Sequence, residues 1–333
     1  MDRAAIAEAF TPAAHEAVKS FPIEPERIEL VALSENVTFR VTDRRDGAAY
    51  VLRLHRPGYH TLEELNSERV WTRALAEAGV AVPIPLTARD GSDYVSVPVP
   101  RLGQHRQAGM TRWTEGELLS DVLRGKDDVD LLEHHFEQLG AIEAVMHIQS
   151  SGWRPPPGFT RHALDTEGLM GDAPFWGPFW EHPVFSPAER RLMIETRDRI
   201  RRVMERYGRD PSIYGVIHAD LHPGNLLVEG DRLTVIDFDD AGFGWRLYDI
   251  AVALFYHQAS PHFTAVRDAF VRGYRTKREI GDDALALIPM FLLVRGLAHM
   301  GWLHQRPEID ASSFIMARKN GLCAQCEAFE APF

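Results

Sequence analysis

Two aspartates and an asparagine surround a tight turn in the segment VIHADLHPGNLLVEGDRLTVIDFDD, residues 216–240. The pattern predicts a loop at His218–Gly224, a strand at Leu226–Val228, a turn at Gly230–Asp231 and a strand at Leu233–Phe238. Asp220, Asn225 and Asp237 then lie at neighbouring points of one hairpin. Two carboxylates held together repel unless a cation lies between them, and Mg²⁺ binds carboxylate, amide and phosphate oxygens. The segment therefore predicts a metal-dependent active site.

The composition limits the partners of such a site. A chain of 333 residues is long enough for one large domain or two ordinary ones, and its 45% hydrophobic and 26% charged residues are typical of globular proteins. The net charge of −11 argues against nucleic acid or an anionic membrane as the main partner, because both require a basic face. We expect no nucleic-acid and no membrane partner.

The two cysteines, Cys323 and Cys326, form a C-x-x-C pair near the end of the sequence. A structural zinc site needs two more ligands, so we expect two ordinary thiols on a C-terminal helix and a reducing compartment. Residues 1–18 contain no apolar run of signal-peptide length, and we find no stretch of about 18 apolar residues. These features predict a cytoplasmic protein and leave its oligomeric state open.

The first hundred residues favour strands. Three short β-rich runs are Ile28–Leu33, Val37–Thr42 and Ala49–Leu54, and DYVSVPVP is a further candidate that its prolines weaken. A helix is predicted between them, with Thr61 as N-cap, Glu64 three residues later and Gly79 at the end. This part predicts a small antiparallel sheet with one inserted helix.

The remainder favours helices. VDLLEHHFEQLGAIEAVMHIQS has apolar residues at helical spacing, Ser186 to Tyr207 is predicted to be a charged helix, and the chain after Asp249 is predicted to be all-helical. Residues 152–183 are rich in Pro, Gly and Trp and have no clear period. Such a segment is either a lid or a packed connector, and both remain open.

The motif H-x-D-x-x-x-x-N followed by a D-F strand resembles the catalytic and metal loops of the protein-kinase-like fold. The version HADLHPGNLL…VIDFDD is similar to the aminoglycoside phosphotransferase and choline kinase-like superfamily, which includes homoserine kinases and a bacterial stress-response Ser/Thr kinase. The resemblance implies an α+β, two-lobed fold. Residues 1–110 would form a nucleotide-binding lobe with a small antiparallel sheet and one helix, and residues 111–333 a mostly helical catalytic and substrate-binding lobe.

The resemblance also implies roles for the hairpin. Asp220 would be the base that accepts the proton of the substrate hydroxyl, and Asn225 and Asp237 would hold Mg²⁺ against the phosphates of ATP. Asp249 resembles the buried aspartate that braces the catalytic loop in this superfamily. Asp239 is open: it assists the metal or faces the substrate.

Further positions match the nucleotide side. Ser34, Glu35 and Asn36 occupy the place of the phosphate-covering loop, without the G-x-G-x-x-G of protein kinases. Arg53 stands where the family has Lys or Arg in a strand, and Glu68 is its expected ion-pair partner.

The segment GMTRWTEGELL resembles the linker between the lobes. Met110 would lie near the adenine, and the backbone from Arg112 to Thr114 would hydrogen-bond it. Four residues are candidates for the substrate pocket: Trp176, Trp180, Asp240 and Tyr248.

The expected function is an ATP- and Mg²⁺-dependent phosphotransferase acting on a hydroxyl of a small molecule, such as an amino-alcohol, an amino sugar or a homoserine-like compound. One alternative is a Ser/Thr protein kinase of the stress-response type, which requires an open groove for an extended peptide near Gly168–Pro183. The other is a nucleotide-binding regulatory module without transferase activity, although such a module need not keep Asp220, Asn225 and Asp237.

Overall fold

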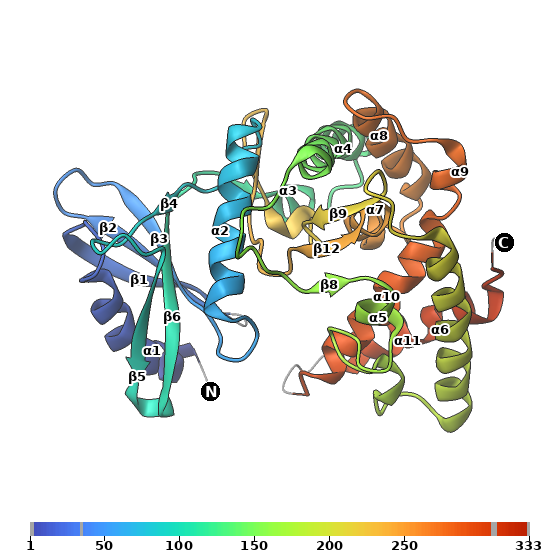
Figure 1. Ribbon diagram of the computed structural model, residues 1–333, viewed down its shortest axis with the longest axis horizontal. Coiled ribbons are helices and arrows are strands. Elements are labelled where there is room, and N and C mark those ends of the chain that lie inside the picture. The colour runs from blue at the N-terminus through green and yellow to red at the C-terminus, as the bar shows by residue number, and fades with distance from the viewer. Residues whose placement is uncertain (1–2, 34–35, 308–311, 332–333) are drawn as a thin grey trace. The chain divides into compact units, whose positions relative to one another are not determined.

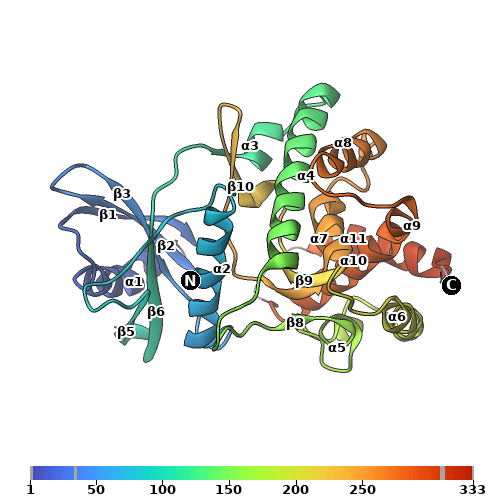
Figure 2. The same cartoon turned by 45° about the horizontal axis from the view of Figure 1, so that its top comes forward.

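The computed structural model describes residues 3–33, 36–307 and 312–331, and the chain divides into two compact units (Figure 1, Figure 2). The N-terminal unit comprises the chain up to Glu117 together with Pro155–Thr160 and Leu227–Asp239. The C-terminal unit comprises Leu118–Arg154, Arg161–Leu226 and the chain from Asp240 onward. The boundary expected after residue 110 falls inside a strand, and the segment with Asp237 is grouped with the N-terminal unit.

The N-terminal unit is built on a six-stranded sheet in which β1, β2, β3, β6 and β4 are successive neighbours and β5 also pairs with β6. All the pairings are antiparallel. The strands are β1 (Pro25–Leu33), β2 (Val37–Asp43), β3 (Ala49–Leu54), β4 (Pro85–Leu86), β5 (Tyr94–Val99) and β6 (Gln104–Arg112). The three runs predicted from the sequence are therefore strands, and so is DYVSVPVP.

Helix α2 (Leu62–Glu77) begins where its capping residues predict. The Thr61 side chain accepts a hydrogen bond from the Glu64 backbone, and the Glu64 side chain accepts one from the Thr61 backbone. Gly79 follows the helix with a φ of +87°, which glycine adopts without steric cost.

A helix that we did not predict precedes the sheet. Helix α1 (Arg3–Val18) packs against β1 and β5 and buries small residues, including Ala13, Ala14 and Ala17, in one core with Phe39. The expectation of a single helix in this part was wrong. Alanines give a weak apolar stripe, and Pro12 inside the helix is a residue that usually breaks helices.

The hairpin of the opening motif forms β10 (Leu226–Glu229) and β11 (Arg232–Val235). Strand β11 is shorter than predicted, so Asp237 and Phe238 lie beyond its end. Asp237 has a φ of +63°, in the left-handed region that few non-glycine residues adopt. The short strand β7 (Glu117–Leu118) lies at the boundary of the units.

The C-terminal unit is mostly helical. Its helices are α3 (Leu119–Leu123), α4 (Val129–Gly152), α5 (Thr166–Met170), α6 (Pro187–Tyr207), α7 (Arg246–Phe255), α8 (Phe263–Arg275), α9 (Asp282–Leu285), α10 (Ile288–His304) and α11 (Ser312–Ala328). In its small sheet, β12 (Gly242–Trp245) pairs antiparallel with β9 (Tyr214–Ile217) and parallel with β8 (Ala163–Leu164). Strand β9 leads into the loop of Asp220, and β12 leads into α7.

Helix α10 is the core helix of this unit. The stretch Asp282–His304 is long and apolar enough to cross a membrane, contrary to our reading of the sequence, but 72% of its apolar window is buried inside the fold. Nearly every residue from Ile288 to Leu303 is buried, as expected for a helix that is apolar all round. Length and composition alone are therefore weak evidence for a membrane span here.

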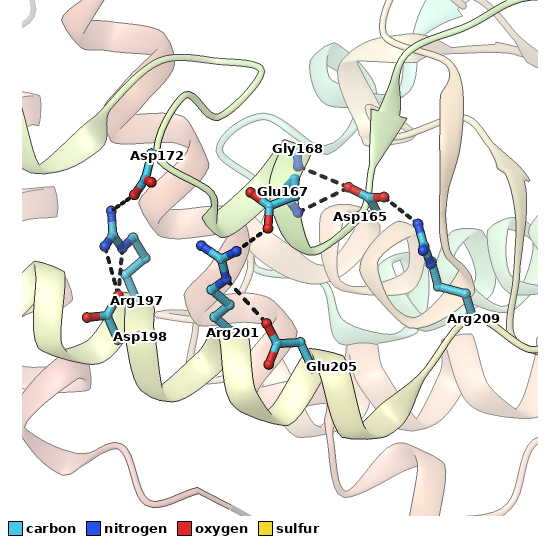
Figure 3. Close-up of polar contacts among 9 residues, drawn as sticks. All are labelled: Asp165, Glu167, Gly168, Asp172, Arg197, Asp198, Arg201, Glu205 and Arg209. Carbon is cyan, nitrogen blue, oxygen red and sulfur yellow. Dashed lines mark hydrogen bonds and ion pairs between the residues drawn. The ribbon is translucent and has the colours of Figure 1, made fainter.

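The Trp- and Pro-rich segment packs as a connector from Arg161 onward. Leu169, Met170 and Phe179 are buried, and ion pairs join the segment to α6 (Figure 3). In that network Glu167 pairs with Arg201, Asp172 with Arg197, and Asp165 both caps α5 and pairs with Arg209. Trp176, which belongs to the same segment, also lines the pocket of the candidate active site.

Candidate active site

Helix α7 holds the backbone of the loop that carries Asp220. Asp249 is fully buried, and its carboxylate accepts hydrogen bonds from the backbone N–H groups of His218 (3.0 Å) and Ala219 (2.7 Å). Ala219 has a φ of +65°, and these two bonds hold it in that strained conformation. His147 on α4 lies 3.2 Å from the same carboxylate, so the brace extends to a second helix.

The Asp220 carboxylate is held from two sides. Its Oδ1 accepts a hydrogen bond from Arg295 Nη2 at 2.5 Å, and its Oδ2 accepts one from Asn225 Nδ2 at 2.8 Å. His222 Nε2 lies 3.5 Å from Oδ2. Burial alone raises the pKa of Asp220, but His222 and Arg295 outweigh it and hold the pKa well below its ordinary value. The Asp220 carboxylate is therefore ionised and held in one orientation.

Asp220 lines a pocket of about 170 Å³, which we call the acceptor pocket. Aromatic rings and charged groups share its wall: Trp176, His222, Asp240, Tyr256, Arg295, His299 and Trp302. The Arg295 guanidinium also lies 5.7 Å from the centre of the Trp176 ring, within the range of a cation–π contact. The pocket thus combines an ionised carboxylate with a wall of aromatic rings and charged side chains.

Two of the four predicted pocket residues, Trp176 and Asp240, line this pocket. Trp180 instead packs under the Arg197 guanidinium, and Tyr248 is fully buried. Sequence reasoning missed Arg295, Tyr256, His299 and Trp302. Arg295 stands in an apolar core helix, and a single arginine there was the one signal available.

Within the N-terminal unit, Arg53 on β3 meets Asp237. Arg53 Nη1 lies 2.9 Å from Asp237 Oδ1. Burial lowers the pKa of Arg53, but Asp237 and Asp239 reverse the effect and raise it above its ordinary value. The expected partner Glu68 contributes a weaker attraction, and its Oε2 is buried without a hydrogen-bond partner among the described residues. The ion pair of Arg53 is therefore with Asp237 and not with Glu68.

Asp239 is tied into the same unit. Asn36 Nδ2 donates to its carboxylate at 3.1 Å, and His55 Nδ1 lies 3.5 Å from its other oxygen. The Asn36 side-chain oxygen Oδ1 in turn accepts a hydrogen bond from the Arg56 backbone N–H at 2.9 Å. The Asn36 side chain therefore links the Asp239 carboxylate to the backbone that follows β3. Ser34 and Glu35 lie outside the described residues.

Part of the segment that we expected to contact the adenine is engaged in the β-sheet. Met110 lies within β6, paired with Leu52 and Leu86, and is buried. The backbone N–H of Arg112 donates to Ile84 and that of Trp113 to Ala49. These two N–H groups are therefore used within the fold, and Thr114 is the next residue along the predicted segment.

The sequence of this chain matches those of known proteins. The sequence model of the family described as "Phosphotransferase enzyme family" matches residues 28–287. An amicoumacin kinase of Bacillus subtilis is 25% identical over 305 residues, which cover 89% of this chain and 85% of that protein.

Solved structures match over nearly the full chain. The microcompartment-associated aminopropanol kinase is 32% identical, with a TM-score of 0.83 and coverage of 95% of this chain and 96% of that one. An amicoumacin kinase in complex with AMP-PNP, Ca²⁺ and Ami is 21% identical, with a TM-score of 0.78 and coverage of 97% and 96%. The expected α+β, protein-kinase-like fold is thereby confirmed, and the chain belongs to the phosphotransferase enzyme family.

Proposed function

We propose that this protein transfers the γ-phosphate of ATP to a hydroxyl of a small amino alcohol. The observation that carries the proposal is the Asp220 carboxylate, held by Arg295 and Asn225 at the wall of a pocket of about 170 Å³. Pockets for drug-sized ligands measure about 300–1,000 Å³. The smaller acceptor pocket favours a compact acceptor, such as the one named for the aminopropanol kinase, over a bulky amino sugar.

Asp220 is the proposed base. An acceptor hydroxyl in the pocket would donate its hydrogen bond to the carboxylate and pass its proton there as its oxygen bonds to the γ-phosphorus. The bond between that phosphorus and the bridging oxygen would break at the same time, and ADP would leave. A carboxylate with a lowered pKa is a weak base, so its main contribution is to orient the hydroxyl. This is consistent with phosphoryl transfer, in which positioning and electrostatics supply most of the catalysis.

Asn225 and Asp237 are the proposed Mg²⁺ ligands. The Asn225 amide nitrogen donates to Asp220, which leaves its carbonyl oxygen as a ligand, and the Asp237 side chain is 36% exposed. Carboxylate and amide oxygens suit a hard divalent cation, so these residues fit the metal. The metal, when bound with ATP, neutralises charge on the phosphates.

The N-terminal unit is the proposed nucleotide-binding part. Arg53 would place its positive charge near the phosphates, Ser34, Glu35 and Asn36 would contribute contacts to them, and Glu68 would support Arg53 at longer range. Met110 would contribute an apolar surface near the adenine, with backbone from Arg112 to Thr114 beside it. Use of ATP also favours a cytoplasmic location.

The two alternatives receive less support. An extended peptide needs an open groove, whereas Met170, Trp176 and Phe179 in the connector are buried. A regulatory module has no need for a base oriented as Asp220 is.

Phosphate transfer from labelled MgATP tests the proposal. The acceptors are ethanolamine, 1-amino-2-propanol, homoserine, an aminoglycoside and a generic protein, each with wild type and Asp220→Asn. We expect labelling of the small amino alcohols, its loss in the variant, and unchanged MgATP binding. Labelling of protein alone would overturn the proposal, and turnover by the variant would refute the role of Asp220.

A further inference from the structure

A second pocket in the C-terminal unit, also of about 170 Å³, shares no lining residue with the acceptor pocket. Its wall includes Tyr207 at the end of α6, Arg246 at the start of α7, Tyr274 near the end of α8, and Arg278 just after α8. None of these residues has a role in the proposed phosphate transfer. We call this the two-arginine pocket.

Two guanidinium groups converge here on one neutral hydroxyl. Arg246 Nη2 lies 2.7 Å from Ser151 Oγ, and Arg278 Nη1 lies 3.0 Å from the same atom. Ser151 Oγ donates its own hydrogen to the His147 carbonyl at 2.5 Å, so only its lone pairs face the arginines. Neither arginine forms an ion pair with a carboxylate anywhere in the described ranges.

Arg246 is the less satisfied of the two. It is only 4% exposed, and its Nε and Nη1 are buried without hydrogen-bond partners in the part of the chain that the structure describes. Burial, and then the charge of Arg278, lower the pKa of Arg246 to about 10. Arg278 is half-buried and also donates to the Ser212 carbonyl at 2.8 Å. The buried Arg246 thus shares a neutral acceptor with a second cation and lacks the counter-charge that buried guanidinium groups normally have.

We propose that the two-arginine pocket binds a phosphate-sized dianion, either free phosphate or the phosphate group of a small monoester. Guanidinium groups present planar, fixed donors that match phosphate oxygens. One water molecule occupies about 30 Å³ of liquid, so the pocket has room for a partly hydrated phosphate. The one acidic residue in the lining, Glu279, is exposed, so water screens it more than it screens Arg246.

The position of this pocket connects it to the brace of the catalytic loop. Arg246 is the first residue of α7, and Asp249, which holds the loop, follows within the first turn. Ser151 bonds to the carbonyl of His147, whose ring bonds to Asp249. An anion on Arg246 would therefore lie at the start of the helix whose Asp249 holds the backbone of His218 and Ala219. The binding proposal is independent of the identity of the acceptor.

Calorimetric titration at fixed ionic strength tests the site, with inorganic phosphate and O-phosphoethanolamine as probes and AMP-PNP saturating the nucleotide site. The variant is Arg278→Gln, and the matched control is Arg267→Gln, because Arg267 lies on α8, which precedes Arg278, and its one ion pair among the described residues is with the adjacent Asp268. We expect saturable binding that Arg278→Gln weakens about tenfold or more and that the control preserves. Binding of one probe alone identifies the source as free phosphate or a monoester.

Two results would overturn the site: no saturable binding of either probe, or equal affinity in wild type and Arg278→Gln. A measurement that needs no variant is anomalous diffraction from crystals grown with selenate. We expect a selenium peak beside the Arg246 and Arg278 guanidinium groups, and peaks only at other positions would contradict the proposal.

Discussion

Arg295 Nη2 and Asp220 Oδ1 lie 2.5 Å apart, although 75 positions separate the two residues in the sequence. Arg295 comes from the core helix α10, and its side chain is 7% exposed. The second oxygen of Asp220 is held by Asn225, so the carboxylate has little freedom to rotate. The proposed base is thus fixed both by its own loop and by a distant helix.

Loss of this contact should lower turnover more than acceptor binding. A hydrogen bond to a charged group contributes about 1.5–3 kcal/mol, so we expect Arg295→Gln to lower kcat about tenfold to a hundredfold. MgATP binding should be unchanged. Steady-state kinetics with both substrates check this, and added guanidine should restore part of the kcat of Arg295→Ala. An unchanged kcat in Arg295→Gln would refute the positioning role.

The brace of the catalytic loop predicts a combined loss of stability and turnover. Each carboxylate oxygen of Asp249 accepts one of the two backbone hydrogen bonds. In Asp249→Asn an NH₂ group replaces one of these oxygens, so the side chain can no longer accept from both His218 and Ala219. We expect the free energy of unfolding to fall by about 2–4 kcal/mol, and kcat to fall at temperatures where the variant is still folded. Urea denaturation and kinetics measure the two effects. Asp268→Asn, on the exposed face of α8, is the control and should change neither.

Features set by short-range rules were predictable from the sequence. Thr61 and Glu64 form the capping box that their spacing predicts, and β2 buries alternate residues as its period of two predicts. The turn around Asp220 and Asn225 follows from a motif of eight residues, and both side chains do meet. In each case the partners are only a few residues apart.

Features set by long-range packing were not predictable. Nothing near Arg53 distinguishes Asp237, 184 positions away, from Glu68, which is close in sequence and on a helix. Arg295 and Trp302 join the acceptor pocket only because α10 packs beside the Asp220 loop. Helix α1 was missed because its alanines gain stability from the sheet they cover and give little periodic signal of their own.

The buried His147 predicts a loss of stability on acidification. Burial, its largest influence, lowers the pKa of His147 below the ordinary value of 6.5, so the unfolded chain binds its proton first as pH falls. Its contribution is present above about pH 6.5 and decreases below it, by at most about 1.4 kcal/mol per pH unit. Urea denaturation of wild type and His147→Gln at pH 7.5 and 5.5 measures this. We expect a smaller pH dependence in the variant, and equal slopes would contradict the assignment.

We expect Trp302 to limit the size of the acceptor that the pocket admits. Its indole lines the acceptor pocket and stacks near His299, with ring centres 5.7 Å apart. Trp302→Ala should enlarge the pocket and shift the ratio of kcat/KM for bulky over compact amino alcohols about tenfold toward the bulky ones. Competition assays with paired acceptors measure the ratio, with Trp302→Phe as the conservative control. An unchanged ratio would show that another residue sets the limit.

We expect that position 116, in the segment that follows β6, requires glycine. Its φ is +127°, and a Cβ there would lie 2.7 Å from the Val228 carbonyl oxygen. Gly116→Ala therefore introduces both strain and a clash with backbone, and we expect about 3 kcal/mol of destabilisation.

Gly125→Ala is the matched control, because Gly125 has a φ of +69° but no atom within 4 Å of the position that a Cβ would take. It should cost only the left-handed conformation, about 1–2 kcal/mol. Denaturation midpoints of the two variants are compared, and their difference reports the close approach of Val228 together with the less accessible φ of Gly116. Equal midpoints would mean that β10 yields to a methyl group, and that the glycine at 116 is required for its backbone conformation alone.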